Sequence, residues 1–480
     1  MILIQKGYEC KFEMDIFINI FFEKEEEGTI YSEFSHENDK IFVKTKIEFL
    51  GKEYFNDYSY NFSSSETDKR LIKKIYSCAC VKSFIRAAKK IRNINIPWGA
   101  MSGIRPAKSV RKFREEGYND EEIRKLLKDI YEVSDEKISL ALEVSKNEEE
   151  ILKKIGKNSV SIYIGIPFCP SRCLYCSFVS TDIRHSGKYM DDFLKCLFKE
   201  IEKTRDILDE LGLHVENIYI GGGTPTTLNE YQLSSLLECI EKNLITVNLN
   251  EFTLEAGRPD TITYEKLSAA KKGNITRISI NPQTMNNETL IKIGRKHTPE
   301  DIIKSFYEAR NAGFTNINMD LIAGLPGEVP EMFYKSLNDV IELDPENITV
   351  HSMCIKRAAA LRFSGLKLSD EDYINKMLSF TQQRMKETDR SPYYMYRQKN
   401  ISGNSENVGY AKEGFMSFYN INIMEEAQTI IALGGGGSSK LVLGERIERV
   451  FNFKDPYEYI RRFDEILKKK EETVKILKGM

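Results

Sequence analysis

Three cysteines, Cys169, Cys173 and Cys176, lie on one short segment with the spacing Cys-x3-Cys-x2-Cys. Thiolates hold iron–sulfur clusters, and a cubane cluster normally takes four of them. Three thiolates leave one iron with an open coordination position, which the amino and carboxylate groups of a small ligand would fill. Structural zinc is the rival metal, but it usually takes four closed ligands, and the nearest candidate, His185, lies nine residues on. The third interpretation is three buried thiols.

Further groups that suit ligand binding follow short apolar stretches. The run Gly221-Gly-Gly-Thr allows a close backbone approach to a ligand, because glycine has no Cβ. The carboxylates of Glu255 and Asp320 accept charge-assisted hydrogen bonds, and an acidic residue inside an apolar strand is costly without a partner. Gln283 and Arg295, twelve residues apart, complete the set. Each has an alternative interpretation: the glycine run could be a simple turn, Glu255 a surface residue and Arg295 a solvated helix residue.

The elements that must position these groups alternate between short apolar stretches and connections long enough for a helix, which is typical of parallel βα units. Six such units make a partial barrel, and in barrels the chemistry lies at the carboxyl ends of the strands. The sequence therefore predicts an α/β fold with a partial (β/α)6 barrel. The predicted strands are Ser161–Ile166, Asn217–Ile220, Glu251–Ala256, Arg277–Ile280, Asn316–Ile322 and Asn347–His351.

The barrel is expected to occupy residues 159–355, between two regions of different texture. Residues 1–95 contain alternating aromatic and β-branched runs, one of them from Met14 to Phe22, and predict a small β-rich unit with a helix. Residues 96–158 predict a charged helical linker region.

Residues 356–480 predict an α+β extension. Its expected helices are Asp370–Lys386 and Asp455–Leu477, and its expected strands are Tyr393–Arg397 and Tyr419–Met424. The helix of the N-terminal unit is expected from about Asp68 to Ile91.

Composition narrows the class of protein. The 480 residues include 70 basic and 72 acidic ones, a net charge of −2 that does not indicate a nucleic-acid surface. No stretch approaches about 18 uninterrupted apolar residues, so no membrane span is predicted. Nine cysteines, an odd number in a long chain, argue against a disulfide framework and for a reducing, cytoplasmic location. The six cysteines outside the segment are expected to be small buried apolar residues.

These motifs together resemble the radical S-adenosylmethionine (SAM) superfamily, and within it the oxygen-independent coproporphyrinogen III oxidase family. The resemblance covers residues 159–351 and rests on Tyr163-x-x-Ile-Pro-Phe-Cys, Gly-Gly-Gly-Thr-Pro-Thr, the Gln283–Arg295 spacing and Asp-Leu-Ile-x-Gly-Leu-Pro. The C-terminal runs that begin at Tyr396 and Ala432 are similar to those of the HemZ-type proteins.

The resemblance implies two cofactors, a [4Fe-4S] cluster on the three cysteines and SAM. In the family the glycine-rich loop contacts the methionyl amino group of SAM, and some members hold a second SAM. Tyr163 joins the cysteines as a catalytic position. The positions that the resemblance assigns to SAM contacts are Tyr163, Tyr175, Ser177, Gly222, Gly223, Thr224, Glu255, Gln283, Arg295 and Asp320.

The implied reaction is oxidative decarboxylation. An electron from the cluster cleaves SAM to methionine and a 5′-deoxyadenosyl radical, which takes a hydrogen from the β-carbon of a propionate side chain. Loss of carbon dioxide, and of one electron to an electron acceptor that the reaction also implies, leaves a vinyl group, and two rounds convert coproporphyrinogen III to protoporphyrinogen IX in porphyrin biosynthesis. The implied partners are this tetrapyrrole and a low-potential electron carrier of the flavodoxin or ferredoxin type.

Two departures from the oxidases keep other functions open. Phe178 stands where the best-known oxidases carry a fourth cysteine, which the heme-binding relatives also lack, and Gly165 stands where those oxidases have a histidine. The alternatives are a heme-binding or heme-trafficking protein and an anaerobic heme-modifying radical enzyme. A heme carrier needs an axial ligand, and the available histidines are His36, His185, His214, His297 and His351.

A polyanionic tetrapyrrole should be met by arginines and lysines, because guanidinium groups bind carboxylates bidentately. Solvated surface charge is the alternative interpretation of each candidate. The glycine run before Lys440 is not a phosphate-binding P-loop, because the lysine does not directly follow the last glycine. The basic candidates are Arg105, Lys108, Arg111 and Lys112 before the barrel, and Lys356, Arg357 and Arg362 after it.

Overall fold

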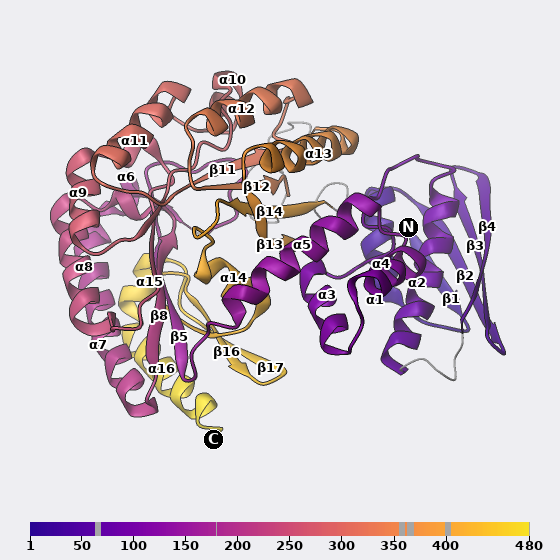
Figure 1. The fold of residues 1–480 in the computed structure, drawn as a ribbon, viewed down its shortest axis with the longest axis horizontal. Helices are drawn as coiled ribbons and strands as arrows, with labels where there is room; N and C mark the ends of the chain where they lie inside the picture. The colour runs from indigo at the N-terminus through magenta and orange to yellow at the C-terminus, as the bar shows by residue number, and fades with distance from the viewer. Residues whose placement is uncertain (63–68, 179, 355–360, 362–368, 399–404, 480) are drawn as a thin grey trace.

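The computed structural model describes residues 1–62, 69–178, 180–354, 361, 369–398 and 405–479. These residues form two lobes (Figure 1). The smaller, N-terminal lobe holds a four-stranded sheet, and the larger lobe holds a long curved sheet with helices on its outer side. Helix α5 (Asp135–Leu152) lies between the two lobes.

Six parallel strands form the centre of the large sheet and confirm the six predicted strands. Their spatial order is β5-β8-β9-β10-β11-β12, which is also their order along the chain. Their carboxyl ends therefore meet at one end of the sheet, as expected of a barrel. The strands are β5 (Ser159–Ile166), β8 (His214–Gly222), β9 (Glu251–Glu255), β10 (Arg277–Ser279), β11 (Ile317–Ala323) and β12 (Asn347–Ser352).

The sheet continues beyond these six strands at both edges with C-terminal strands. At one edge β15 (Thr429–Gly434) pairs in parallel with β5, and β16 (Ser438–Leu443) and β17 (Arg446–Phe451) follow in antiparallel pairing. At the other edge β14 (Glu406–Ala411) pairs antiparallel with β12 and then with β13 (Ser391–Arg397). The sheet is open, with β13 and β17 as its edges among the described residues.

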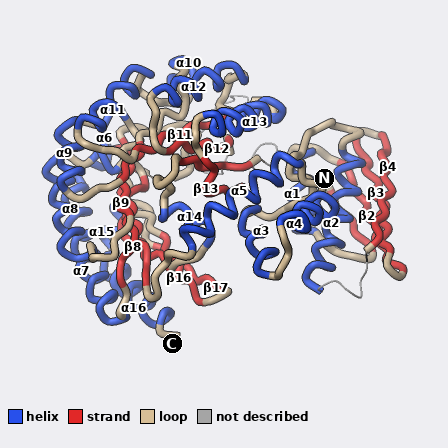
Figure 2. Tube along the Cα trace, in the orientation of Figure 1, coloured by secondary structure: helices blue, strands red, loops and turns tan. Residues whose placement is uncertain are grey.

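Helices cover the outer face of this sheet (Figure 2). Side chains alternate between the two faces of a strand, so Ile162 and Ile164 of β5 are buried outward while Tyr163 faces the interior cavity. Amphipathic helices bury their apolar faces against the outward side chains. The covering helices are α7 (Met190–Leu211), α8 (Glu230–Leu244), α9 (Tyr264–Lys272), α10 (Asn287–Lys292), α11 (Pro299–Asn311), α12 (Pro330–Glu342) and α13 (Glu371–Glu387).

The N-terminal lobe differs from the prediction in one element. The run from Met14 to Phe22, expected as a strand, lies mostly in helix α1 (Lys11–Phe21), so that prediction was wrong. Met14, Phe17, Ile18 and Phe21 are buried, at the three- and four-residue spacing of one helix face. The lobe's other elements are β1 (Ile2–Lys6), β2 (Gly28–Glu37), β3 (Lys40–Phe49), β4 (Lys52–Asn61), α2 (Lys69–Ala88), α3 (Pro106–Glu115) and α4 (Asp120–Tyr131).

Three expectations elsewhere need correction. Residues 419–424, expected as a strand, lie in helix α14 (Phe418–Glu425), whose Ser417 side chain caps the first turn. The closing helix is two helices, α15 (Pro456–Arg461) and α16 (Phe463–Leu477). Of the six cysteines outside the segment, Cys196, Cys239 and Cys354 are half-buried and the other three are buried.

Candidate functional site

The cysteine segment follows the carboxyl end of β5 and runs beside the C-terminal end of helix α10. Cys173 is buried, and Cys169 and Cys176 are half-buried. The backbone N–H of Cys176 donates to Cys173 O (3.2 Å), and that of Leu174 donates to Ile293 O (3.0 Å). All three cysteines line one cavity of about 600 Å³, a size common for small-molecule sites.

The donor set fits an iron–sulfur cluster better than a single ion. Within the described ranges, no three His, Cys, Asp or Glu side chains converge closely enough to hold one metal ion. A cubane offers each thiolate its own iron, so its ligands need not converge on one point. Burial raises the pKa of the Cys169 thiol, and it raises that of Cys176 to about 11. A coordinating metal removes such protons, because the thiolate is the ligand.

The glycine run after β8 lies directly against the cysteine segment. The N–H of Gly223 donates to Ile166 O (2.8 Å), and Gly222 has a φ of +109°, which favours glycine. A Cβ at Gly223 would lie 2.5 Å from Phe168 O and 3.0 Å from the Cys169 sulfur. The sequence predicted that the backbone of the glycine run closely approaches another group. In the structure that group is the cysteine segment.

Glu255 ends β9 on the interior side, beside tyrosines from three elements. The Tyr219 hydroxyl donates to Glu255 Oε1 (2.5 Å). The Tyr219 ring stacks on Tyr419 of α14, with centroids 4.6 Å apart, and lies 6.2 Å from the parallel ring of Tyr163. Burial raises the pKa of Glu255 to about 7, although the Tyr219 hydrogen bond acts in the opposite direction. The arrangement places a carboxyl group that titrates near neutrality beside flat aromatic surfaces.

Asp320 of β11 faces the same interior and has the partners that its burial requires. Its Oδ2 lies 3.7 Å from Nε2 of His351 on β12, and its Oδ1 accepts from Asn318 Nδ2 (2.7 Å). Burial alone would raise the pKa of Asp320, but these partners hold it below its ordinary value. Gln283 has a φ of +67°, and its N–H donates to Asp320 O (2.8 Å). This left-handed turn sets Gln283 against the wall of the cavity.

Arg295 is buried and links the strand ends to the cysteine segment. Its Nη1 donates to the carbonyl oxygens of Gly257 and Asn281, both at 2.9 Å. Its Nη2 donates to the Tyr175 hydroxyl (2.9 Å). The interpretation of Arg295 as a solvated helix residue is wrong, since it joins the ends of β9 and β10 to Tyr175.

The structure brings every predicted site residue to one cavity, although these residues come from five strand ends. Each of them lines the wall of that cavity. They are Tyr163, Cys169, Cys173, Tyr175, Cys176, Ser177, Gly222, Gly223, Thr224, Glu255, Gln283, Arg295 and Asp320.

The basic residues expected before the barrel are engaged elsewhere. Arg105 Nη2 donates to Glu426 Oε1 (2.7 Å), and Lys108 Nζ donates to Glu425 O (3.0 Å). Arg111 Nη2 lies 2.7 Å from Glu425 Oε2. These residues tie α3 to the end of α14 and do not line the cavity.

Lys112 is exposed and does not line the cavity either. Lys356, Arg357 and Arg362 lie outside the described residues.

Sequence reasoning missed three cations that do line the cavity, Arg258, Arg277 and Lys440. Arg277 begins β10, where strand alternation from Ser279 would have placed it inward. Arg258 follows Glu255 by three residues, but nothing local signals its contact with the cysteine segment. Lys440 lies on β16, and only the pairing of β15 with β5 brings it to the site.

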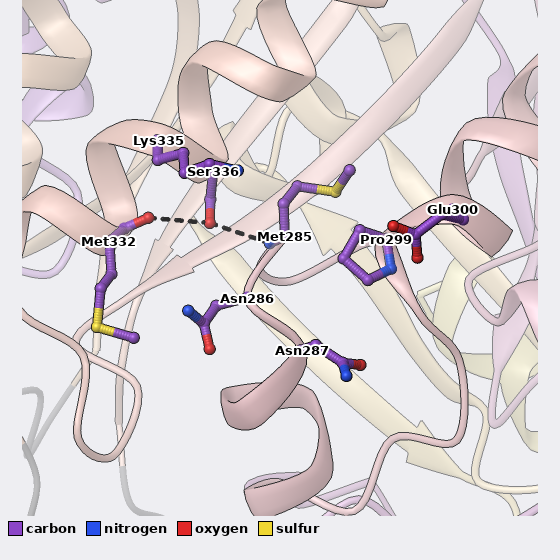
Figure 3. Close-up of a pocket in the computed structure, with 8 residues that line it drawn as sticks. All are labelled: Met285, Asn286, Asn287, Pro299, Glu300, Met332, Lys335 and Ser336. Carbon is purple, nitrogen blue, oxygen red and sulfur yellow. Dashed lines mark hydrogen bonds between the residues drawn. The ribbon is translucent and has the colours of Figure 1, made fainter.

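A second, smaller cavity of about 280 Å³ lies among α10, α11 and α12 (Figure 3). The N–H of Met285 donates to Ser336 Oγ (3.0 Å), which itself donates to Met332 O (3.1 Å). None of the predicted site residues lines this cavity.

The described helices include none with the length and apolar character needed to cross a membrane.

Comparisons with known proteins identify relatives of this chain. Residues 163–340 match the family model described as the radical SAM superfamily. The oxygen-independent coproporphyrinogen-III oxidase-like protein HemZ of Bacillus subtilis is 41% identical over 84% of this chain and 82% of its own length. The heme chaperone HemW of the same organism is 39% identical over 41% of this chain and about half (51%) of its own length.

Among solved structures, coproporphyrinogen III oxidase (HemN) from Escherichia coli superposes with a TM-score of 0.53 at 24% identity. The match covers 67% of this chain and 73% of that one. It supports the fold.

Proposed function

The chain belongs to the radical SAM superfamily, in its family of oxygen-independent coproporphyrinogen III oxidase-like proteins of HemZ type, and from this membership we propose that it decarboxylates coproporphyrinogen III to protoporphyrinogen IX. Superfamily membership implies a [4Fe-4S] cluster and SAM. The observation that carries the proposal is that one cavity is lined both by the three thiols of the cysteine segment and by polar groups from the neighbouring strand ends.

In this proposal Cys169, Cys173 and Cys176 hold the cluster. The bound cluster and SAM would together supply the 5′-deoxyadenosyl radical, with the electron drawn from a carrier of the flavodoxin or ferredoxin type. The glycine run lies directly against the cysteine segment and has no side chains there. Its backbone groups can therefore contact the methionyl end of a SAM bound beside the cysteines.

The remaining site residues orient the ligand. Glu255 and Asp320 accept hydrogen bonds from ribose hydroxyls or amines. Gln283, Ser177 and Thr224 supply neutral polar contacts. Arg295 and Tyr175 hold each other and so fix one wall of the cavity. Tyr163 and its stacked neighbours form a flat apolar surface, which excludes water from a reactive radical.

The substrate carboxylates need cations, and Arg277 and Lys440 are the better candidates. Arg277 is 2% exposed, and its Nη1 donates a long hydrogen bond to Phe415 O (3.4 Å). Lys440 Nζ donates to Ile423 O (3.1 Å), and its burial lowers its pKa to about 8. Arg277 is charged throughout, and a propionate carboxylate would favour the charged form of Lys440.

The test is anaerobic turnover of the full-length protein. The cluster is reconstituted, then SAM, dithionite and coproporphyrinogen III are added, and the products are analysed by mass spectrometry. The proposal expects 5′-deoxyadenosine together with a porphyrinogen lighter by two carbon dioxide units and four hydrogen atoms. A Cys173→Ala variant should produce neither. An unchanged tetrapyrrole in the presence of SAM cleavage would contradict the decarboxylase assignment.

A second candidate function is heme binding, by analogy with the chaperone relative and the absence of a cysteine at Phe178. Of the histidines, His351 is the one that lines the described cavity, where its Nδ1 lies 3.5 Å from the Tyr396 hydroxyl. This alternative expects a stable heme complex whose absorption spectrum changes in His351→Ala and not in His185→Ala. Protein that turns over coproporphyrinogen and shows no such complex would exclude it.

A further inference from the structure

Arg258 touches the cysteine segment directly. It lies on the loop after β9 and is only 4% exposed. Its Nη1 donates to the Cys173 sulfur (3.3 Å) and to Ser171 O (3.4 Å), and its Nη2 donates to Ser171 Oγ (3.0 Å). Sequence separation between Arg258 and Cys173 is 85 residues, so the fold alone creates this contact.

A carboxylate holds this guanidinium in place. Asp260 accepts from Arg258 Nε (2.9 Å) and Nη2 (2.8 Å). This bidentate pairing fixes the plane of the guanidinium, so that Nη1 is left to face Cys173. The negative charge of Asp260 also partly offsets the positive charge of Arg258 near the cysteine segment.

The three sulfurs therefore have unequal surroundings. Cys173 accepts from a charged donor, whereas Cys169 accepts from the neutral hydroxyl of Thr224 at 3.5 Å. Cys176 lies near the backbone N–H of Phe178. Hydrogen bonds to charged groups are about twice as strong as neutral ones, so the contact to Cys173 has the largest electrostatic effect.

Reduction adds one electron to a cluster and makes it more negative. Hydrogen bonds to cluster sulfurs and nearby positive charge stabilise that added electron, and they are among the factors that set iron–sulfur potentials. A buried guanidinium acts strongly because little water screens it.

We propose that Arg258 is a positioning residue that raises the reduction potential of the cluster through its N–H on Cys173, and that Asp260 limits this effect. The inference rests on the proposed binding of the cluster by Cys169, Cys173 and Cys176. It assigns opposite effects on the reduction potential to the two residues of one ion pair. Substitutions of the two residues should therefore shift the midpoint potential in opposite directions.

The test is a potentiometric titration of the reconstituted full-length protein without SAM or substrate, followed by electron paramagnetic resonance of the reduced cluster. Iron and sulfide are assayed first. Arg258→Gln should shift the midpoint potential to a more negative value, and Arg258→Lys should shift it less. Asp260→Asn, which keeps the shape and removes the negative charge, should shift it to a more positive value.

Arg390→Gln is the matched control. Arg390 is also a buried arginine with a carboxylate partner, Asp344 (2.8 Å), but it binds Pro345 O at the opposite end of the sheet, before β12. It should leave the midpoint unchanged.

Unchanged midpoints in fully loaded Arg258→Gln and Asp260→Asn would overturn the inference and leave the proposed function intact. If Arg258→Gln fails to retain its cluster, the signs of the shifts in Arg258→Lys and Asp260→Asn decide, and shifts of the same sign would overturn it. Wild-type protein without iron and sulfide would overturn the proposed function as well.

Discussion

The Tyr219 hydroxyl donates to the Glu255 carboxylate across 2.5 Å, between the adjacent parallel strands β8 and β9. This bond stabilises the ionised form of Glu255, while burial favours the protonated form more strongly and brings its pKa to about 7. The charge of the cavity wall beside the glycine run therefore changes within the physiological range of pH.

Binding of SAM should consequently depend on pH. Below pH 7 Glu255 is mostly protonated and is a poorer acceptor, so affinity should fall as the pH falls through about 7. Glu255→Gln should bind weakly and show no such transition. Tyr219→Phe removes the bond that lowers this pKa, so its transition should move to higher pH. Equilibrium dialysis of SAM with the unreduced, cluster-loaded protein measures all three; a transition that survives in Glu255→Gln would refute the assignment.

The contact between the glycine run and the cysteine segment should limit cluster loading. A Cβ at position 223 meets Phe168 O at 2.5 Å and the Cys169 sulfur at 3.0 Å, so Gly223→Ala must displace one of the two loops. We expect iron and sulfide per chain to fall several-fold after reconstitution. Gly103→Ala is the control, because no atom lies within 4 Å of its added Cβ. Equal loading of the two variants would contradict the prediction.

Recognition of the substrate carboxylates should depend on Arg277. Arg277→Gln keeps a polar side chain but loses the charge, and it should weaken binding of coproporphyrin III about tenfold, equivalent to about 1.4 kcal/mol. Fluorescence titration of the apoprotein measures this affinity. Lys112→Gln, at an exposed position outside the cavity, should bind as the wild type does. Equal losses in both variants would indicate a general charge effect.

Besides its pairing with β5, the C-terminal strand β15 is tied to helix α7 of the barrel by one buried acid. Glu200 accepts from Gly434 N (2.8 Å) and Asn452 Nδ2 (2.8 Å), and its Oε1 lies 3.0 Å from Lys470 Nζ. Glu200→Ala leaves the buried Lys470 without this partner, so the free energy of unfolding should fall by about 3–5 kcal/mol.

The control for this prediction is an exposed pair, Lys478 with Glu210. Lys478→Ala should cost about 0–1 kcal/mol, because water screens such pairs. Urea unfolding under anaerobic conditions measures both variants, and a loss below about 1 kcal/mol in Glu200→Ala would disprove the anchoring role.

Short-range pattern was sufficient for the barrel and for most of its site. The six strands and the motifs at their ends depend on local alternation of apolar and polar residues and on turns that follow each strand. Since parallel strands align their carboxyl ends, knowing the strand order places Glu255, Gln283 and Asp320 near the cysteines without any further information.

The local sequence pattern predicted the wrong type of element where burial in the tertiary structure decides between strand and helix. Tyr419 to Met424 alternates like a strand, yet Ser417 caps it as a helix and the Tyr419 ring packs on Tyr219. The run from Met14 fails for the same reason, because both the two-residue and the helical period place apolar groups on one face.

The sequence by itself determined the cysteine spacing, the strand ends and hence the cofactor chemistry that the family implies. Only the tertiary structure decided which cations reach the site. Arg105, Lys108 and Arg111 contact Glu425 and Glu426 and do not line the cavity. Arg258 lines it from a loop, and Lys440 lines it from a distant strand although it also lies 3.9 Å from Glu426. Ion pairs and hydrogen bonds depend on distance in space, and nothing in the local sequence around Arg258 signals its contact with Cys173, 85 positions away.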